Sequence, residues 1–233
     1  MLPEHSERLS VFAIGFLDMN EFSPSQVVEL NHSLAQHHLA SLRDQATRPS
    51  QFRYHAGVLA TLLAAEVTSS LPLRKVSVRT PLEVMECQEL AARIAAVPIL
   101  RAGLGMVTPL TDMIPDLEVW HLGLYRDEET AQPVHYYDKL PATHPPDVAI
   151  VLDPMLATGG SASLAIAALK RWGVAKIFML SIIAAPEGIR RVLSEFSDIK
   201  IYTAAVDRQL NDRKYILPGL GDAGDRIFNT LPH

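Results

Sequence analysis

Residues 150–161 read Ile-Val-Leu-Asp-Pro-Met-Leu-Ala-Thr-Gly-Gly-Ser. The apolar run Val148–Leu152 predicts a buried strand that ends at the carboxylate of Asp153. Thr158–Ser161 then leads into a predicted helix, Ser161–Arg171. The two glycines leave backbone N–H groups uncovered, and the helix dipole directs its positive end to the same place. The stretch therefore predicts a phosphate-binding loop between a strand and a helix.

Asp153 adds a second requirement to this loop. A site for phosphate alone gains nothing from a neighbouring negative charge, because like charges repel. A phosphorylated sugar is a better match, since ribose hydroxyls can donate hydrogen bonds to the carboxylate while the phosphate lies on Thr158–Ser161. The residues therefore favour a ligand that carries both a ribose and a phosphate.

The elements that follow alternate regularly. Gly173 ends the first helix, and then come a predicted strand at 177–184, a helix at 186–196 and a strand at 199–206. Alternating strands and helices predict parallel pairing with right-handed crossovers. The expected fold class is therefore α/β, with a central, mostly parallel sheet flanked by helices.

The N-terminal half has a less regular pattern. Apolar residues at helical spacing predict helices at 27–43, 52–69 and 106–113. Short apolar runs predict strands at 75–79, 95–100 and 119–124. The polar segment 126–140 is expected to form an extended loop or hairpin. We expect residues 1–25 to be an N-terminal extension and residues 26–233 to form a single domain to which the N-terminal helices are added.

Composition limits the classes of function. The chain has 233 residues, 48% of them apolar, and its net charge of −5 argues against a dedicated nucleic-acid surface. The apolar segment 9–17 is too short to span a bilayer. The one cysteine, Cys87, suits a reducing compartment, and the scattered histidines lack the spacing of metal ligands. We therefore expect a cytoplasmic protein with no membrane or nucleic-acid partner and no metal ligand of its own.

Three more polar clusters lie where strands are expected to end or near the C-terminus: Arg101-Ala-Gly, Tyr125-Arg126-Asp127 and the glycine-rich tail 218–225. Ligands of open parallel sheets bind beyond the carboxyl ends of the strands, so we expect these clusters to meet the loop at Asp153. The Arg101 guanidinium suits a diphosphate, with an ion pair at the strand end as the alternative. For Arg126 the alternative is a local ion pair with Asp127 or Glu129, and for the tail it is a surface turn.

Four segments closely resemble uracil phosphoribosyltransferases of the type I phosphoribosyltransferase family: Val97–Met106, Asp153–Ser161, Ala184–Ile189 and Pro218–Arg226. The resemblance runs from about 30 to 230 and is densest after Val97. The Asp-Pro pair at 153–154 is typical of the uracil enzymes, whereas most type I members have two acidic residues there. The resemblance implies the type I fold, with a flexible hairpin or hood over the active site. It also implies the reaction of uracil with 5-phosphoribosyl 1-diphosphate (PRPP) to UMP and diphosphate.

The resemblance also implies roles for single residues. It places PRPP on Arg101, Arg126 and Asp222 and on the loop Asp153, Pro154, Met155, Leu156, Ala157, Thr158, Gly159, Gly160 and Ser161. It places uracil on Ile216, Gly221, Asp222 and Ala223. The catalytic roles belong to Arg101, Arg126, Asp153 and Asp222. Lys214 departs from the family pattern, because a glycine is usual just before the Tyr-Ile of the uracil loop.

The resemblance further implies Mg²⁺ bound mainly through PRPP, a homodimer or homotetramer, and GTP as an effector in parts of the family. Because PRPP must be protected from hydrolysis, we expect 126–140 to close over the site. Other functions stay open: a regulatory or degenerate protein that binds uracil, UMP or PRPP without turnover, an RNA-binding attenuator, or a phosphoribosyltransferase for another base. The net charge argues against the attenuator, and the intact Arg101, Asp153 and Asp222 argue against the degenerate protein.

Overall fold

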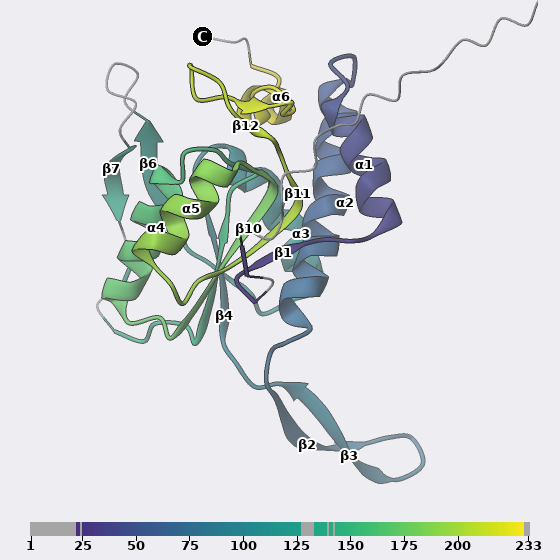
Figure 1. The fold of residues 1–233 in the computed structure, drawn as a ribbon. Coiled ribbons are helices and arrows are strands. Elements are labelled where there is room, and N and C mark those ends of the chain that lie inside the picture. The colour runs from purple at the N-terminus through teal and green to yellow at the C-terminus, as the bar shows by residue number, and fades with distance from the viewer. Residues whose placement is uncertain (1–21, 24, 127–132, 139, 142, 231–233) are drawn as a thin grey trace, which may run out of the picture.

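The computed structural model of the protein describes residues 22–23, 25–126, 133–138, 140–141 and 143–230. Within these residues, seven strands form a sheet in the order β1-β11-β10-β8-β4-β5, with β9 beside β10 (Figure 1). The strands are β1 Val27–Glu29, β4 Ile94–Pro98, β5 Glu118–Val119, β8 Val148–Leu152, β9 Met155–Leu156, β10 Lys176–Ala184 and β11 Lys200–Val206. All their pairings are parallel, which confirms the expected α/β class.

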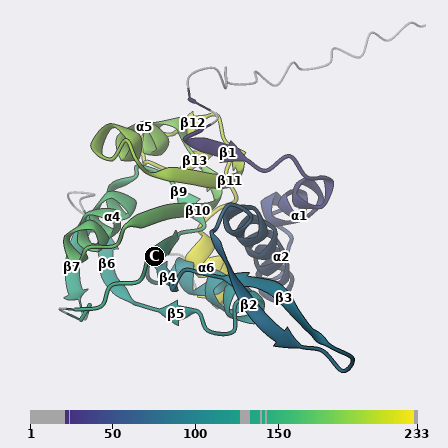
Figure 2. The same cartoon turned by 90° about the horizontal axis from the view of Figure 1, so that it is seen from below.

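Helices cover both faces of this sheet. On one face lie α1 Ser33–Arg43, α2 Pro49–Thr68 and α3 Val107–Met113, and on the other lie α4 Gly160–Trp172 and α5 Pro186–Glu195 (Figures 1 and 2). In β8, Ile150 and Leu152 pack with α1 and α2, while Ala149 and Val151 pack with α4. Because both faces are covered, β8 is apolar at every position. The N-terminal helices are thus a layer of the fold and share its core.

The elements around residues 150–161 are confirmed. β8 has the predicted bounds, and α4 begins one residue before the predicted helix and ends one residue after it. Gly173 ends α4 in the left-handed conformation, with φ +97°, and its N–H donates to the carbonyls of Leu169 and Lys170. β10, α5 and β11 lie within one residue of their predicted positions at each end.

The predicted helix over 27–43 is wrong in its first part. Val27–Glu29 is an edge strand that pairs with Ile201–Thr203, and the helix begins only after His32, whose Nδ1 accepts from the Leu34 N–H. Val27 and Leu30 are both buried, and their spacing of three also fits a helix. The free edge of β11 decides between the two structures, since the Leu30 N–H continues the pairing by donating to the Thr203 carbonyl.

The single strand predicted at 119–124 is two strands. The sheet strand β5 ends at Val119, and β6 Leu122–Arg126 pairs antiparallel with β7 Pro133–Asp138, with an irregular register between Gly123 and Leu124. The hairpin expected at 126–140 therefore begins before Arg126. Its tip, 127–132, lies outside the described residues.

The strand predicted at 75–79 is one half of a long arm. β2 Leu73–Arg79 pairs antiparallel with β3 Val84–Leu90, a strand that was not predicted from the sequence. The arm leaves the body beside the start of β4, at the amino ends of the strands (Figures 1 and 2). The residues of both strands are exposed or half-buried. Because neither face of the arm is buried, no alternation of buried and exposed side chains marks these strands in the sequence.

The remaining elements are short. A 3₁₀ helix, η2 Ala102–Met106, precedes α3, and the glycine-rich tail contains α6 Ala223–Phe228, which the sequence did not predict. β12 Gln209–Leu210 and β13 Ile216–Leu217 form a two-stranded ladder before it. The expected extension 1–25 lies almost wholly outside the described residues. In the described part of the chain, no helix has the length and apolar character needed to cross a membrane.

Candidate active site

The turn with Arg101 and the loop with Asp153 lie side by side at the carboxyl ends of β4 and β8. The Ile99 N–H donates to the Leu152 carbonyl at 2.9 Å. A Cβ built on Gly103 would lie 2.3 Å from the same carbonyl oxygen, so the turn can approach this closely only with glycine there. The peptide bond between Leu100 and Arg101 is cis. Strand order thus brings together two clusters that are about fifty residues apart in the chain.

The loop between β8 and α4 has the geometry of an anion site. Met155 and Leu156 form β9 and pair with Ile183 and Ala184, which anchors the middle of the loop to β10. Gly159 precedes α4 with φ +77° and no side-chain cap, and the first turn of α4 has no acidic residue. The N-terminal N–H groups of α4 are thus left without a side-chain acceptor, as a bound phosphate requires.

The start of α5 braces this loop. A Cβ on Gly188 would lie 2.4 Å from the Ala157 carbonyl oxygen, and one on Gly159 would lie 2.8 Å from the Gly188 carbonyl oxygen. Glu187 Oε1 accepts from the Leu210 N–H at 3.0 Å and so ties α5 to β12. No role for Gly188 or Glu187 was predicted from the sequence. Their only signal was their place in the Ala184–Ile189 motif.

Asp153 carries the carboxylate of the site. Its backbone N–H donates to the Leu180 carbonyl, and its Oδ1 accepts from the Met155 N–H at 3.2 Å. Burial raises the pKa of the Asp153 carboxyl to about 7, and the Met155 hydrogen bond opposes that rise. Hydroxyl groups that donate to this carboxylate would favour its ionised form.

Arg101 and Asp222 meet at the start of α6. Arg101 Nη2 lies 3.3 Å from Asp225 Oδ1, and the Arg101 side chain is 54% exposed. Asp222 caps α6 by accepting from the Asp225 N–H at 2.9 Å. A Cβ on Gly224 would lie 3.2 Å from Asp222 Oδ1 and 3.9 Å from Arg101 Nη2. Arg101 thus forms an ion pair, the alternative to diphosphate binding that was named for it above. Its partner is Asp225, at the edge of the site.

The proposed uracil loop lies beside these residues. Ile216 is buried in β13, Gly221 has φ +78°, and Ala223 is the first residue of α6. Lys214 has φ +64°, a left-handed conformation that suits the glycine usual at this place. A cavity of about 410 Å³ opens next to the loop. It is lined by Gln45, Thr47, Pro49, Tyr215, Asp222, Asp225, Arg226, Asn229 and Thr230.

Two expectations about the site concern residues whose side chains the structure does not describe. Arg126 ends β6, and both its assigned role and its local ion pair with Asp127 or Glu129 lie outside the side chains that the structure describes.

Among the described residues, no three His, Cys, Asp or Glu side chains form a group that could hold a metal ion.

An acidic residue directly before a phosphate loop, at the carboxyl ends of the strands of a parallel α/β sheet, is the arrangement of a phosphoribosyltransferase. The sequence profile of the family named uracil phosphoribosyltransferase matches residues 28–230. The chain belongs to the uracil phosphoribosyltransferase family.

Individual relatives are similar over most of their length. A uracil phosphoribosyltransferase from Roseiflexus castenholzii is 52% identical over 205 residues, which cover 88% of this chain and 99% of the relative. One from Lysinibacillus sphaericus is 48% identical over 207 residues, with the same coverage. The solved structure of the AQ2163 protein from Aquifex aeolicus has a TM-score of 0.84 and 35% identity, and the match covers 89% of this chain and 100% of that one.

Proposed function

We propose that this protein transfers the phosphoribosyl group of PRPP to uracil, forming UMP and diphosphate. The observation that carries the proposal is the meeting of Asp153, its phosphate loop and Arg101 at one edge of the sheet, beside the loop 216–223. Family membership supports this reaction.

The loop and its carboxylate hold the phosphoribosyl group. The 5′-phosphate lies on the N–H groups of Thr158–Ser161, at the positive end of α4, and the ribose hydroxyls donate to Asp153. With the ribose fixed at both ends, its anomeric carbon has a defined position. Positioning of this kind supplies much of the rate of a two-substrate reaction.

Arg101, together with Arg126, holds the diphosphate. Cleavage of the bond between the anomeric carbon and the diphosphate leaves an electron-poor carbon and a strongly anionic leaving group. Guanidinium groups on that leaving group stabilise charge that grows in the transition state, and loss of one such donor typically costs about 10²–10³ in rate. Asp225, the ion-pair partner of Arg101, keeps the guanidinium at the edge of the site.

Uracil is recognised by the backbone of Ile216 and of Gly221–Ala223. Backbone N–H and C=O groups can pair with the amide edge of a pyrimidine, and glycine allows the flat base to approach closely. Asp222, which caps α6, then lies between the base and PRPP. Uracil N1 attacks the anomeric carbon from the side opposite the diphosphate, while the bond from that carbon to the diphosphate oxygen breaks and its electron pair leaves with the diphosphate. The N1 proton passes to the departing diphosphate.

Magnesium belongs to the proposal as a partner of PRPP. The described residues offer single carboxylates such as Asp153 and no group of three that could form a protein cage. This donor set fits an ion whose ligands come mainly from the diphosphate and the ribose hydroxyls. When bound in this way, Mg²⁺ supplies further charge neutralisation of the diphosphate. A cytoplasmic location and GTP as an effector remain further proposals.

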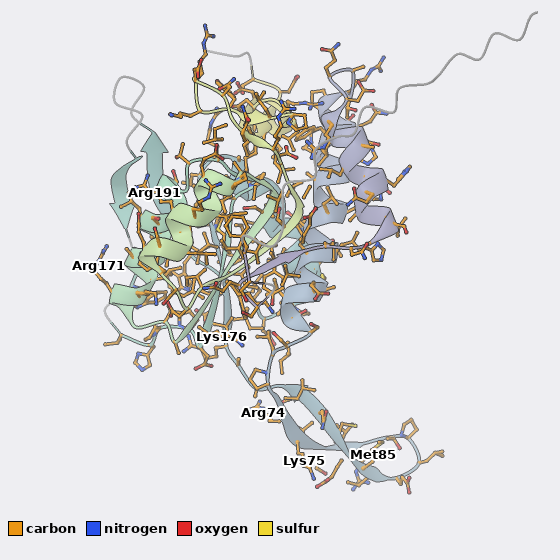
Figure 3. The ribbon with its side chains drawn as sticks, in the orientation of Figure 1. Arg74, Lys75, Met85, Arg171, Lys176 and Arg191 are labelled. Carbon is orange, nitrogen blue, oxygen red and sulfur yellow. The ribbon has the colours of Figure 1, made fainter. Side chains whose placement is uncertain are left out.

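We also propose that the protein is a homo-oligomer, a dimer or a tetramer, that uses the β2–β3 arm. Val76, Val78, Met85 and Cys87 share one face of the arm, where Val78 is 39% and Met85 47% exposed. Figure 3 labels Met85 on the arm. An isolated two-stranded hairpin is marginally stable in water, so the arm needs something to pack against. A second copy of the chain offers an identical apolar strip, which a two-fold interface can match.

The reaction is tested by incubating the purified protein with Mg²⁺, PRPP and each of uracil, cytosine, hypoxanthine and orotate. Formation of UMP and diphosphate from uracil, with little product from the other bases, is the expected result. No turnover with any base, while PRPP or UMP still binds, would contradict the proposal and favour a regulatory protein.

Two variants test the assigned roles. Asp153→Asn should weaken PRPP binding and slow turnover while the protein stays folded. Arg101→Ala should reduce turnover more than uracil affinity, because its contact strengthens in the transition state. Near-wild-type kinetics in either variant would remove the role assigned to that residue.

A further inference from the structure

We infer that Arg43, which lies outside every motif of the site, positions the uracil-recognition loop and thereby sets the affinity for the base. This inference rests on the proposed function, because it names the residue that holds the loop to which uracil is assigned. Arg43 is the last residue of α1, and its side chain is 25% exposed. In the sequence it belongs to an ordinary helix and gives no sign of this role.

The first contact of Arg43 is a two-pronged pair with Asp207. Nη1 lies 2.9 Å from Asp207 Oδ2, and Nη2 lies 2.5 Å from Oδ1. The Asp207 side chain is only 3% exposed, and the Asp207 N–H donates to the Ala184 carbonyl at the end of β10. A planar guanidinium held by both carboxylate oxygens has a fixed orientation. The end of α1 is therefore fixed to the carboxyl edge of the sheet.

The second contact of Arg43 is with Gly219, in the loop assigned to uracil. Gly219 is held at both of its backbone polar groups: its N–H donates to Asp207 Oδ2 and its carbonyl accepts from Arg43 Nη1, each at 2.9 Å. Gly219 has φ +68°, and a Cβ there would lie 2.3 Å from the Ile216 carbonyl oxygen. Gly219 is thus a fixed point between Ile216 and Gly221–Ala223, the residues to which uracil is assigned.

A second arginine, Arg226, also connects the end of α1 to the uracil-recognition loop. Here the arginine belongs to α6 and its acceptors include carbonyls at the end of α1. Arg226 of α6 donates to the carbonyls of Leu42 and Asp44 at the end of α1, at 2.5 and 2.6 Å, and to the Leu220 carbonyl at 2.7 Å. Its guanidinium lies 4.3 Å from the centroid of the Phe52 ring. Arg226 supports the far side of the loop, and Arg43 supplies the hydrogen bond to its centre.

These contacts predict an effect on one substrate only. The partners of Arg43 are Asp207 and Gly219, which belong neither to the phosphate loop nor to the Arg101 turn. Loss of the Arg43 hydrogen bond would leave the Gly219 carbonyl without this donor. The backbone groups assigned to bind the base would then be less precisely positioned. Small misplacements at a recognition site cost up to about 100-fold in binding or rate.

The test compares Arg43→Met and Arg43→Lys with wild type in initial-rate kinetics that vary uracil and PRPP separately. We expect Arg43→Met to raise KM for uracil about 10-fold or more, with KM for PRPP unchanged within about twofold. Arg43→Lys keeps the charge but has a single donor group, so its uracil KM should lie between the two. Low concentrations of guanidinium should partly lower the uracil KM of Arg43→Met.

Three further measurements separate positioning from stability. Arg93→Met, at an exposed ion pair with Glu118, is the matched control and should leave both KM values unchanged. The double variant Arg43→Met/Asp207→Asn removes the unpaired buried charge and should recover thermal stability without recovering uracil affinity. Hydrogen exchange of Arg43→Met should be faster in 216–223 and unchanged in 154–161.

Equal changes in both KM values, or a return of uracil affinity in the double variant, would overturn the inference. If wild type forms no UMP, the proposed function fails by itself. Hydrogen exchange then decides on Arg43, because unchanged exchange in 216–223 would show that Arg43 does not hold the loop.

Discussion

At the scale of single residues, the Asp153 carboxyl makes stability depend on pH. Its folded pKa of about 7 lies above the ordinary value of 3.8, so the folded state keeps a proton that the unfolded chain loses. The contribution of Asp153 to stability is full below pH 3.8, decreases as pH rises, and is lost above about 7. The same burial that suits the carboxyl to ribose hydroxyls therefore weakens the fold at neutral pH.

Asp153→Asn should remove this dependence. Relative to wild type, the unfolding midpoint of the variant should rise by several degrees between pH 5 and pH 8, since about 1 kcal/mol shifts the midpoint by roughly 2–4 °C in a chain of this size. Thermal unfolding at both pH values measures it, with Asp212→Asn, at an exposed position, as the control for adding an amide. A constant difference between the two pH values would contradict the prediction.

Gly188 shows how closely α5 approaches the phosphate loop. In Gly188→Ala, the new Cβ would lie 2.4 Å from the Ala157 carbonyl oxygen and 3.0 Å from that of Leu156, so backbone must move. We expect a loss of about 1–3 kcal/mol in unfolding free energy together with weaker PRPP binding. Thermal unfolding and PRPP titration measure the two effects.

Gly57→Ala is the matched control for this substitution. Its Cβ would meet Pro109 Cγ at 3.5 Å, an ordinary contact, within the helix α2. Because alanine favours a helix over glycine by about 1 kcal/mol, this variant should be as stable as wild type or more so. If both glycine variants behaved alike, the close approach at Gly188 would not be the cause.

At the scale of elements, the β6–β7 hairpin stands beside α4, to which both strands are in contact. Among the described residues, one isolated bridge, between Ile99 and Leu122, ties it to the sheet. Because the described part of the hairpin has this single backbone bridge to the sheet, we expect that it can move as a unit. This supports the expectation that 126–140 closes over PRPP.

Trypsin can test this closure, because it cleaves after Arg126 and Lys139. We expect PRPP with Mg²⁺ to slow cleavage at these two positions, with fragments identified by mass. Cleavage after Arg79, at the end of β2 on the distant arm, is the internal control and should not change. Equal cleavage of 126–140 with and without PRPP would show that the segment is not a flap.

At the scale of the whole molecule, the site lies at the carboxyl ends of the sheet strands and the arm at their amino ends. The phosphate loop follows the carboxyl end of β8, while the arm joins the amino end of β4. Assembly through the arm can therefore be disturbed without touching the residues assigned to catalysis. This separation makes the oligomer proposal testable by itself.

The double variant Val78→Glu/Met85→Lys places opposite charges on a directly paired position of the arm. Because opposite charges across strands are tolerated, the hairpin itself should survive, while its apolar strip is lost. We expect the mass in solution, measured by light scattering, to fall to the 25.6 kDa of one chain. Leu34→Glu, on an apolar side chain of α1 that is 52% exposed, should leave the assembly intact. A monomeric wild type would contradict the oligomer proposal.

Elements whose signals are local could be predicted from the amino-acid sequence. β8 and α4 were predictable within a residue, because an apolar run, a pair of glycines and the terminating Gly173 are all contiguous in the chain. The carboxylate and phosphate loop were predictable for the same reason. The tail 218–225 was predictable as a polar cluster near the site, and the resemblance gave it the role of binding uracil.

Features that depend on partners distant in the chain could not be predicted and became visible in the folded protein. Val27–Glu29 became a strand because β11 has a free edge, and Asp153 acquired its raised pKa because the surrounding fold buries it. Arg43 and Asp207 are 164 positions apart, so no local pattern could show that they meet at Gly219. Local sequence fixes backbone conformation over a few residues, whereas burial, edge pairing and ion pairs exist only once the chain has packed.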